Sequence, residues 1–275
     1  NPCPQEKIPD ALLRHELVQQ AWEGINPELY LDSHLHLVGT GDTDSGIWLH
    51  PDMQNPIQLA QYIRFKFYLN ATCIRDGLAI DVQYVRHLLR LQADFHKGSK
   101  FMLLAFDYRF DEQGHVHKDK TPFAIPNEYA ARIAKQHSQQ FEWAASIHPY
   151  RKDSVELLDW CVKQGARAVK WLPPMMGIDP SSKLCEPFYE ALAKYGIPLL
   201  SHAGDEHAVA GVDAQRLGNP LLLRKPLEHG VKVIVAHCAT LGRNRDIDQG
   251  ANGPEMRNYQ LYSRLMDEKR YEGLL

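Results

Sequence analysis

The stretch Leu29-Tyr30-Leu31-Asp32-Ser33-His34-Leu35-His36 decides how the fold of this chain is interpreted. Its apolar start predicts a β-strand that ends at the two histidines, before the glycine-rich segment Gly39-Thr40-Gly41. Residues two apart on a strand point to the same face, so Asp32, His34 and His36 should share one side. Neutral imidazole is a good ligand for zinc and its transition-metal neighbours. The stretch therefore predicts part of a metal site, with Asp32 as a candidate catalytic carboxylate.

Three further apolar runs end in a residue that can bind a metal ion or a substrate. The run 197–202 ends in His202, the run 231–237 ends in His237, and the run 166–170 ends in Lys170. Continuous apolar runs are typical of buried parallel strands, whose carboxyl ends line the active site of an α/β barrel. These three side chains are therefore expected to converge with the first two histidines.

Strand and helix patterns alternate along the chain, which is typical of a parallel sheet. Their spacing of about 30 residues predicts a (β/α)8 TIM barrel, as a single domain over residues 1–275. A long insertion, 39–100, follows the first strand and is expected at the mouth of the active site. An N-terminal extension, 1–28, precedes that strand. The predicted strands are 29–37, 101–107, 141–148, 167–172, 197–202 and 231–237, and the main predicted helices are 57–69, 80–96, 155–164, 188–195 and 221–229.

A barrel must close, and these six strands would leave two unpaired edges. Residues 271–275 look like a helix end that turns into a seventh strand, so strands seven and eight are expected beyond Leu275. The chain begins at Asn1 rather than Met, which leaves room for a targeting or anchoring segment. The cellular compartment is left open.

The composition is that of an ordinary soluble globular domain, with 44% hydrophobic and 24% charged residues. A formal net charge of -3 gives no basic field for nucleic acid. No apolar stretch approaches the ~20 residues needed to span a membrane. The five cysteines are scattered and indicate neither a disulfide framework nor a CxxC metal site. A small-molecule substrate is expected, and homo-oligomerisation is left open.

Taken together, the motifs resemble those of the amidohydrolase superfamily, in particular its amidohydrolase-2 branch. The resemblance covers residues 29–240. It implies a metal-bearing (β/α)8 barrel with one or two divalent ions, and zinc is the expected metal. In that family the histidines of strand one and strand five bind metal, and the strand-six histidine binds a second metal or positions water and substrate. The motifs that carry it are Asp32-x-His34-x-His36, Lys170 in Val-Lys-Trp-Leu-Pro-Pro, His202 in Ser-His-Ala-Gly and His237 in Val-Ala-His-Cys.

The family pattern also contains an aspartate at the end of strand eight, which has no counterpart among the predicted strands. Two residues keep more than one role. His237 is a metal ligand or a catalytic base, for which a pKa near the working pH is suitable. Lys170 is a carbamylated bridge between two metal ions or a charged group that holds a substrate carboxylate; we favour a mononuclear site.

Other residues at strand ends are candidates for substrate binding or for support of the ligands. Trp171 would form a wall of the pocket or simply pack in the core. The residues after His202 would orient the ligands or cap the next helix. By contrast, His115 and His117 follow no apolar run, so this second His-x-His pair is interpreted as solvated. The full set of supporting candidates is Asp107, His148, Trp171, Asp205 and Glu206.

The leading functional hypothesis is a metal-dependent hydrolase that attacks an amide, lactone or ester carbonyl of a small molecule with metal-activated water. The alternative on the same barrel is a decarboxylase of a small unsaturated acid, with a cationic cluster of Lys170 and either Arg109 or Arg151 binding the carboxylate. A third hypothesis, from another class, is a barrel that binds metal without turnover.

Overall fold

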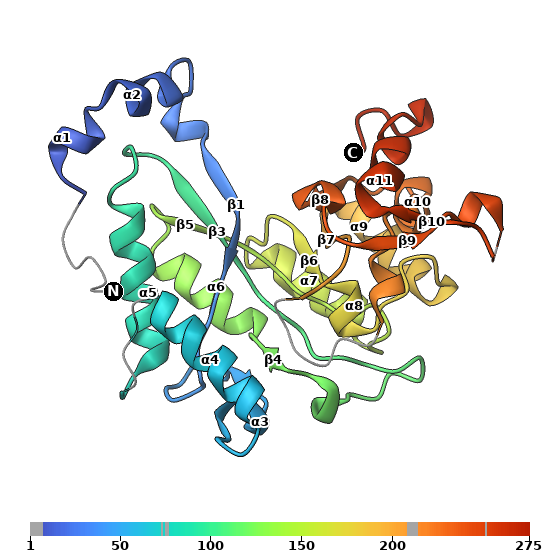
Figure 1. The fold of residues 1–275 in the computed structure, drawn as a ribbon, viewed down its shortest axis with the longest axis horizontal. Helices are drawn as coiled ribbons and strands as arrows, with labels where there is room; N and C mark the ends of the chain where they lie inside the picture. The colour runs from blue at the N-terminus through green and yellow to red at the C-terminus, as the bar shows by residue number, and fades with distance from the viewer. Residues whose placement is uncertain (1–7, 73, 75–76, 208–213, 251) are drawn as a thin grey trace.

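In a computed structural model, the chain is described over residues 8–72, 74, 77–207, 214–250 and 252–275. Two three-stranded parallel sheets form its centre (Figure 1). All six predicted strands are present, and the fold class is α/β. The first sheet has the order β1-β3-β5, with β1 (Leu31–His36), β3 (Lys100–Leu104) and β5 (Phe141–Ala144). The second has the order β6-β7-β8, with β6 (Val169–Trp171), β7 (Leu199–His202) and β8 (Val233–Ala236).

The two sheets are joined between β5 and β6. Ala145 and Val169 form a parallel bridge. The Ala145 N–H donates to the Ala168 carbonyl at 2.9 Å, and the Lys170 N–H donates to the Ala145 carbonyl at 2.6 Å. The strands therefore follow one another in chain order, as they do in a barrel. However, β1 and β8 do not pair within the described residues, so the expected closure into an eight-stranded barrel is not found there.

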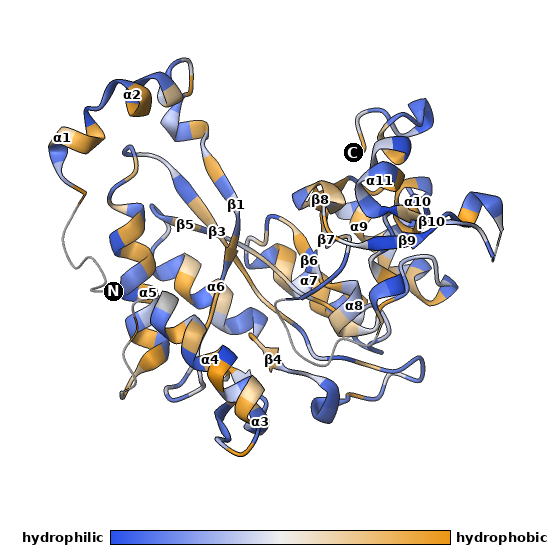
Figure 2. Ribbon diagram, in the orientation of Figure 1, coloured by the Kyte–Doolittle hydropathy of each residue, from blue (hydrophilic) through white to orange (hydrophobic). Residues whose placement is uncertain are grey.

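The C-terminal part contains a ribbon that the sequence did not predict. β9 (Arg243–Arg245) pairs antiparallel with β10 (Glu255–Arg257). Both are short and polar, and β9 is hydrophilic in Figure 2, so the apolar-run criterion misses them. Near the end of the chain, Lys269–Tyr271 is a 3-10 turn, and residues 272–275 form no regular element. The segment after it still lies beside β8, because the Val233 N–H donates to the Leu274 carbonyl at 2.6 Å.

The long helices cover the sheets mostly where the sequence predicts them. In the insertion these are α4 (Leu59–Ala71) and α5 (Ile80–Gln92), followed later by α7 (Ser154–Lys163) and α9 (Glu186–Tyr195). The predicted helix 221–229 is a 3-10 turn, η5 (Pro220–Leu223), that continues as α10 (Arg224–Glu228). The sequence missed α6 (Asn127–Gln136) and α11 (Asn258–Met266). The remaining helices are short: α1 (Asp10–Leu13) and α2 (Glu16–Trp22) in the N-terminal extension, α3 (Pro51–Gln54) and α8 (Pro173–Met176). No helix of the described residues is long and apolar enough to cross a bilayer.

The insertion after β1 is fastened to the rest of the molecule at two places. β2 (Trp48–Leu49) pairs antiparallel with β4 (Phe123–Ala124), which joins it to the loop after β3. Asp81 of α5 is fully buried and accepts hydrogen bonds from the Thr40 N–H at 2.7 Å and the Ser45 hydroxyl at 2.5 Å. Buried carboxylates need such donors. The glycine-rich loop after His36 is thereby held against α5.

Candidate active site

His34 and His36 lie side by side at the carboxyl end of β1. Their Nε2 atoms are 3.2 Å apart. The Phe106 ring stacks on His36 with a centroid separation of 5.4 Å. The Tyr84 hydroxyl, from α5, donates to the His36 carbonyl at 2.7 Å. The expected common face of these two imidazoles is confirmed, and the insertion helps to position it.

His202 and His237 form a second imidazole pair, from β7 and from the turn after β8. The His202 Nδ1 and the His237 Nε2 are 2.9 Å apart, and the His202 Nε2 lies 3.2 Å from the Gly204 carbonyl. A carbonyl can only accept, so the hydrogen bond assigns the proton of His202 to Nε2 and leaves a lone pair on Nδ1. His237 itself has a φ of 92°, in a region that non-glycine residues rarely adopt. Such strain is common at functional sites.

Lys170, on β6, lies among these histidines. It is 1% exposed, and its positive charge contributes to a lowered pKa at His34, His36, His202 and His237. The rings of His34 and His237 are 6.0 Å apart between centroids, so the two pairs face each other from different sheets. The structure therefore brings together all five predicted ligand candidates.

The electrostatics of this cluster favour neutral side chains. Burial, reinforced by Lys170, lowers the pKa of His34 to about 4 and that of His36 to about 3. Burial, followed by the charges of His237 and Lys170, lowers the pKa of His202 to about 3. Burial also lowers the pKa of Lys170 to about 7, although the Glu206 carboxylate opposes this shift. Neutral imidazoles are the form that binds metal.

The cluster fits a metal ion in its donor chemistry. Two nitrogens bound to one tetrahedral zinc at about 2.0–2.1 Å lie about 3.3 Å apart, and the Nε2 atoms of His34 and His36 are 3.2 Å apart. His202 donates its other ring N–H to a carbonyl, as metal-binding histidines almost always do. Within the described residues, however, no three His, Cys, Asp or Glu side chains are grouped closely enough to hold one ion. The candidate ligands are therefore arranged as two imidazole pairs that face each other, His34 with His36 and His202 with His237.

Glu206 places a carboxylate beside the second pair. It is 8% exposed, and its Oε2 lies 3.6 Å from the His202 Nδ1. The side-chain amide of Gln215 holds its backbone on both sides: the Glu206 N–H donates to Oε1 at 2.7 Å, and Nε2 donates to the Glu206 carbonyl at 2.7 Å. This clasp fixes a buried carboxylate beside the imidazoles.

Asp32 and Asp205, by contrast, are engaged elsewhere. Asp32 Oδ1 accepts from the His34 backbone N–H at 3.1 Å, at an irregularity in the pairing of β1. Asp205 Oδ1 lies 3.4 Å from the Asn258 side-chain nitrogen, and its Oδ2 lies 3.8 Å from the His207 Nε2. Both carboxylates therefore support local backbone and loop geometry in this structure.

Three other candidates lie in structural settings. The fully buried His148 has backbone partners at both nitrogens, the Tyr150 N–H at 3.2 Å and the Met176 carbonyl at 3.0 Å. Asp107 accepts from Arg151 at 3.2 Å, and burial raises the pKa of this carboxyl. Trp171 is fully buried, stacks on Phe188 of α9, and donates to the Ile147 carbonyl at 2.8 Å. Because neighbouring strand residues face opposite sides, Lys170 and Trp171 cannot both face the site.

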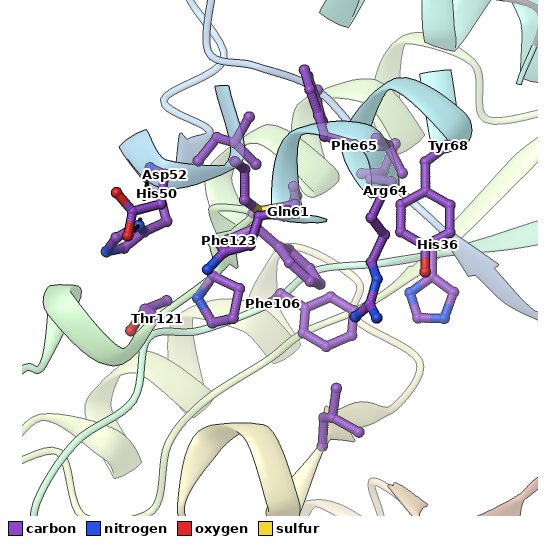
Figure 3. Close-up of a pocket in the computed structure, with 18 of the residues that line it drawn as sticks. His36, His50, Asp52, Gln61, Arg64, Phe65, Tyr68, Phe106, Thr121 and Phe123 are labelled. Carbon is purple, nitrogen blue, oxygen red and sulfur yellow. Dashed lines mark hydrogen bonds and ion pairs between the residues drawn. The ribbon is translucent and has the colours of Figure 1, made fainter. Parts of the chain in front are cut away.

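A cavity of about 530 Å³ opens beside His36 (Figure 3). Glu206 also lines it, so it touches both sides of the cluster. Most of its wall comes from the insertion and from the loop after β3, as expected for elements at the active-site mouth. Sequence analysis missed Arg64 and Phe106, which also line it. Arg64 lies within a predicted helix, and its spacing alone does not indicate a site.

The second His-x-His pair lies away from this cluster, in the loop after β3. Asp111 Oδ2 is 3.3 Å from the His115 Nδ1 and 3.2 Å from the His117 Nε2. The His115 side chain is 72% exposed and that of His117 is 34% exposed. The structure thus places the pair at the surface, as the solvated interpretation predicts.

Comparisons with solved structures return distantly similar proteins, among them a hydrolase, a TIM-barrel protein and a hydratase. A probable 2-pyrone-4,6-dicarboxylic acid hydrolase from Acinetobacter baumannii is 14% identical, with a TM-score of 0.48, over 86% of this chain and 66% of the other. A TIM-barrel protein from Bordetella bronchiseptica is 15% identical, with a TM-score of 0.48, over 75% and 66%. A 4-oxalomesaconate hydratase from Rhodopseudomonas palustris is 18% identical, with a TM-score of 0.44, over 77% and 63%. The chain thus spans less than two thirds of the length of these proteins.

A family model gives the firmer result. No curated protein sequence matches this chain. The family model described as amidohydrolase matches residues 102–265, which is more than half of the chain. That range contains Lys170, His202 and His237, and the motif at His34 and His36 precedes it. The chain belongs to the amidohydrolase family.

Proposed function

We propose that this chain is a metal-dependent hydrolase that cleaves an amide, lactone or ester of a small molecule. One observation carries the proposal: His36 belongs to the imidazole cluster and also forms a wall of the 530 Å³ cavity. A small substrate bound there would place its carbonyl beside the candidate metal ligands. The parallel strands in chain order also favour a (β/α)8 barrel as the parent architecture.

The metal would be held by the two imidazole pairs. His34 and His36 offer Nε2 lone pairs, and His202 offers Nδ1. His237 is a further ligand or a base. When bound, a divalent ion such as zinc would acidify a water molecule and polarise the substrate carbonyl.

The chain itself would supply the remaining groups. Glu206 is suited to accept the proton that the attacking water loses, because its carboxylate is buried, clasped at the backbone and part of the cavity wall. Lys170, with a pKa of about 7, can hold or release a proton at neutral pH. The apolar cavity would limit the access of bulk water.

Decarboxylation of a small unsaturated acid is the second candidate. Arg64 and Arg109 line the same cavity and would bind its carboxylate. Product analysis separates the two reactions, because only the decarboxylase releases carbon dioxide from the acid.

The first test is the metal content of the full chain by plasma mass spectrometry. We expect about one zinc-like ion per chain, lost in His34→Ala/His36→Ala with an unchanged circular dichroism spectrum. About two ions would favour a binuclear site bridged by Lys170. A folded wild-type chain that binds no metal would refute the hydrolase proposal.

A further inference from the structure

The turn that carries His237 has an unusual backbone. Three consecutive residues, His237, Cys238 and Ala239, have positive φ values of 92°, 49° and 47°. Residues other than glycine rarely adopt this region, and they keep it only where the surrounding structure holds them there. The turn follows β8 directly, so its position also depends on the contacts that the next residues of the chain make.

Asn258, the first residue of α11, holds the chain just after this turn. Its backbone N–H donates to the Gly242 carbonyl at 3.1 Å, and its side-chain Nδ2 donates to the Leu241 carbonyl at 2.8 Å. Its Oδ1 accepts from the Asn244 Nδ2 at 2.9 Å. Asn258 is fully buried, and α11 packs against the turn (Figure 1). Because a carbonyl only accepts, these partners fix the orientation of the amide.

The Leu241 carbonyl also joins this anchor to the loop after β7. It accepts a second hydrogen bond, from the Asp205 N–H at 3.1 Å. The Asn258 Nδ2 lies 3.4 Å from the Asp205 Oδ1. Gly242 makes this approach possible, because a Cβ there would lie 1.9 Å from the Asp205 Cγ. Asn258 therefore contacts both loops that carry the second imidazole pair.

The geometry of that pair depends on how the two loops are held. In the loop after β7, the Gly204 carbonyl lies 3.2 Å from the His202 Nε2 and so selects the nitrogen that bears the proton. The His202 Nδ1 lies 2.9 Å from the His237 Nε2, which comes from the other loop. A relative shift of the loops would lengthen this distance and release the His202 ring.

We propose that Asn258 is a positioning residue, whose side-chain amide sets the separation and orientation of the His202 and His237 rings. It acts through the Leu241 carbonyl and the loop of Asp205, not on a substrate. This proposal rests on the proposed function, since it names a residue that supports the same metal site. It gives α11, which lies outside the two central sheets, a role in metal binding.

The decisive test is nitrogen NMR of the histidine side chains in the full chain, after removal of metal with a chelator. We expect His202 to be a single tautomer with its proton on Nε2 in the wild type, with its signals assigned by His202→Gln. Asn258→Leu keeps the shape of the side chain but removes its donor and acceptor, and should give a mixture of the two tautomers. Asn258→Ala is a second variant, which avoids placing an apolar group against the carbonyl.

The second readout is the affinity for zinc alone, measured by competition with a chromophoric chelator. Asn258→Leu should bind zinc at least about tenfold more weakly than the wild type, as is typical when a residue that supports metal ligands is lost.

Asn127→Leu is the matched control. Asn127 is also a buried first residue of a helix, α6, and its side chain accepts from the Ser146 N–H at 2.8 Å and donates to the Ser146 carbonyl at 2.9 Å. This variant should be destabilised to a similar degree, with the His202 spectrum and the zinc affinity of the wild type.

Two results would overturn the proposal: an unchanged single tautomer of His202 in Asn258→Leu, or the same mixture in Asn127→Leu. Both are measured without metal. A wild-type chain that binds no zinc would refute the hydrolase proposal, whereas the tautomer of His202 decides on Asn258 by itself.

Discussion

The molecule contains the same motif twice, His34-Leu35-His36 and His115-Val116-His117, in two different settings. The first pair ends a strand and has no carboxylate partner among the described residues; its Nε2 atoms lie 3.2 Å from each other. In the loop pair, both rings contact Asp111, at 3.3 and 3.2 Å. The strand pair faces His237 across the site, with ring centroids of His34 and His237 6.0 Å apart, whereas the loop pair lies at the surface. The structural environment of a His-x-His motif, and not its sequence alone, therefore distinguishes a candidate metal site from a surface pair.

The largest effect is expected from a substitution of Lys170, which lies near the strand pair His34 and His36 and has no buried counterpart beside the loop pair among the described residues. Lys170→Met removes a buried amine but keeps the approximate length and the apolar stem of the side chain. We expect an unchanged fold and metal content in a mononuclear site, with activity reduced at least about a hundredfold, because a charged or proton-carrying group at the site is lost. Metal analysis and turnover of the same preparation would check this. Retained activity would show that Lys170 is not needed for turnover, so the different setting of the strand pair could not be ascribed to this lysine.

His148, a fully buried histidine outside both pairs, extends the comparison through the pH dependence of stability. Burial lowers the pKa of His148 to about 3, whereas unfolded histidine titrates near 6.5. The unfolded chain therefore binds more protons between those values, and stability is lost as the pH falls through this window. From about pH 7 to about pH 5, the advantage of wild type over His148→Gln in free energy of unfolding should shrink by about 2 kcal/mol. Denaturant unfolding at several pH values measures it, and a constant difference would contradict the assignment of a neutral buried ring.

The smallest effect is expected from His115→Ala/His117→Ala, the matched control for the double substitution on β1. Both side chains lie at the surface of a loop, so the free energy of unfolding should change by less than ~0.5 kcal/mol. Metal content and turnover should remain at wild-type values. A loss of metal in this variant would show that the loop pair, and not only the strand pair, binds an ion.

Sequence was sufficient for the central strands because each is an apolar run that ends in a polar residue. It was insufficient where the orientation of a side chain depends on tertiary contacts and not on the local sequence pattern. Asp32 was expected on the same face as the imidazoles, and in the structure its Oδ1 accepts a hydrogen bond from the His34 N–H, at an irregularity in the pairing of β1 that the sequence does not indicate. The inward position of Lys170 already implied that Trp171 faces the helices. Arg64 could not be found as a cavity residue, because distant segments of the chain build that cavity together.

The antiparallel pairing of β2 with β4 has a consequence for engineering. It ties the insertion 39–100 to the loop 109–126, and the His50 N–H adds a hydrogen bond to the Pro122 carbonyl at 2.8 Å. The two segments together supply most of the cavity wall. A transplant of either one alone would leave unmatched strand edges in the chimaera. The exchangeable cassette of this scaffold is therefore a pair of loops, which must be swapped as one unit to change its ligand.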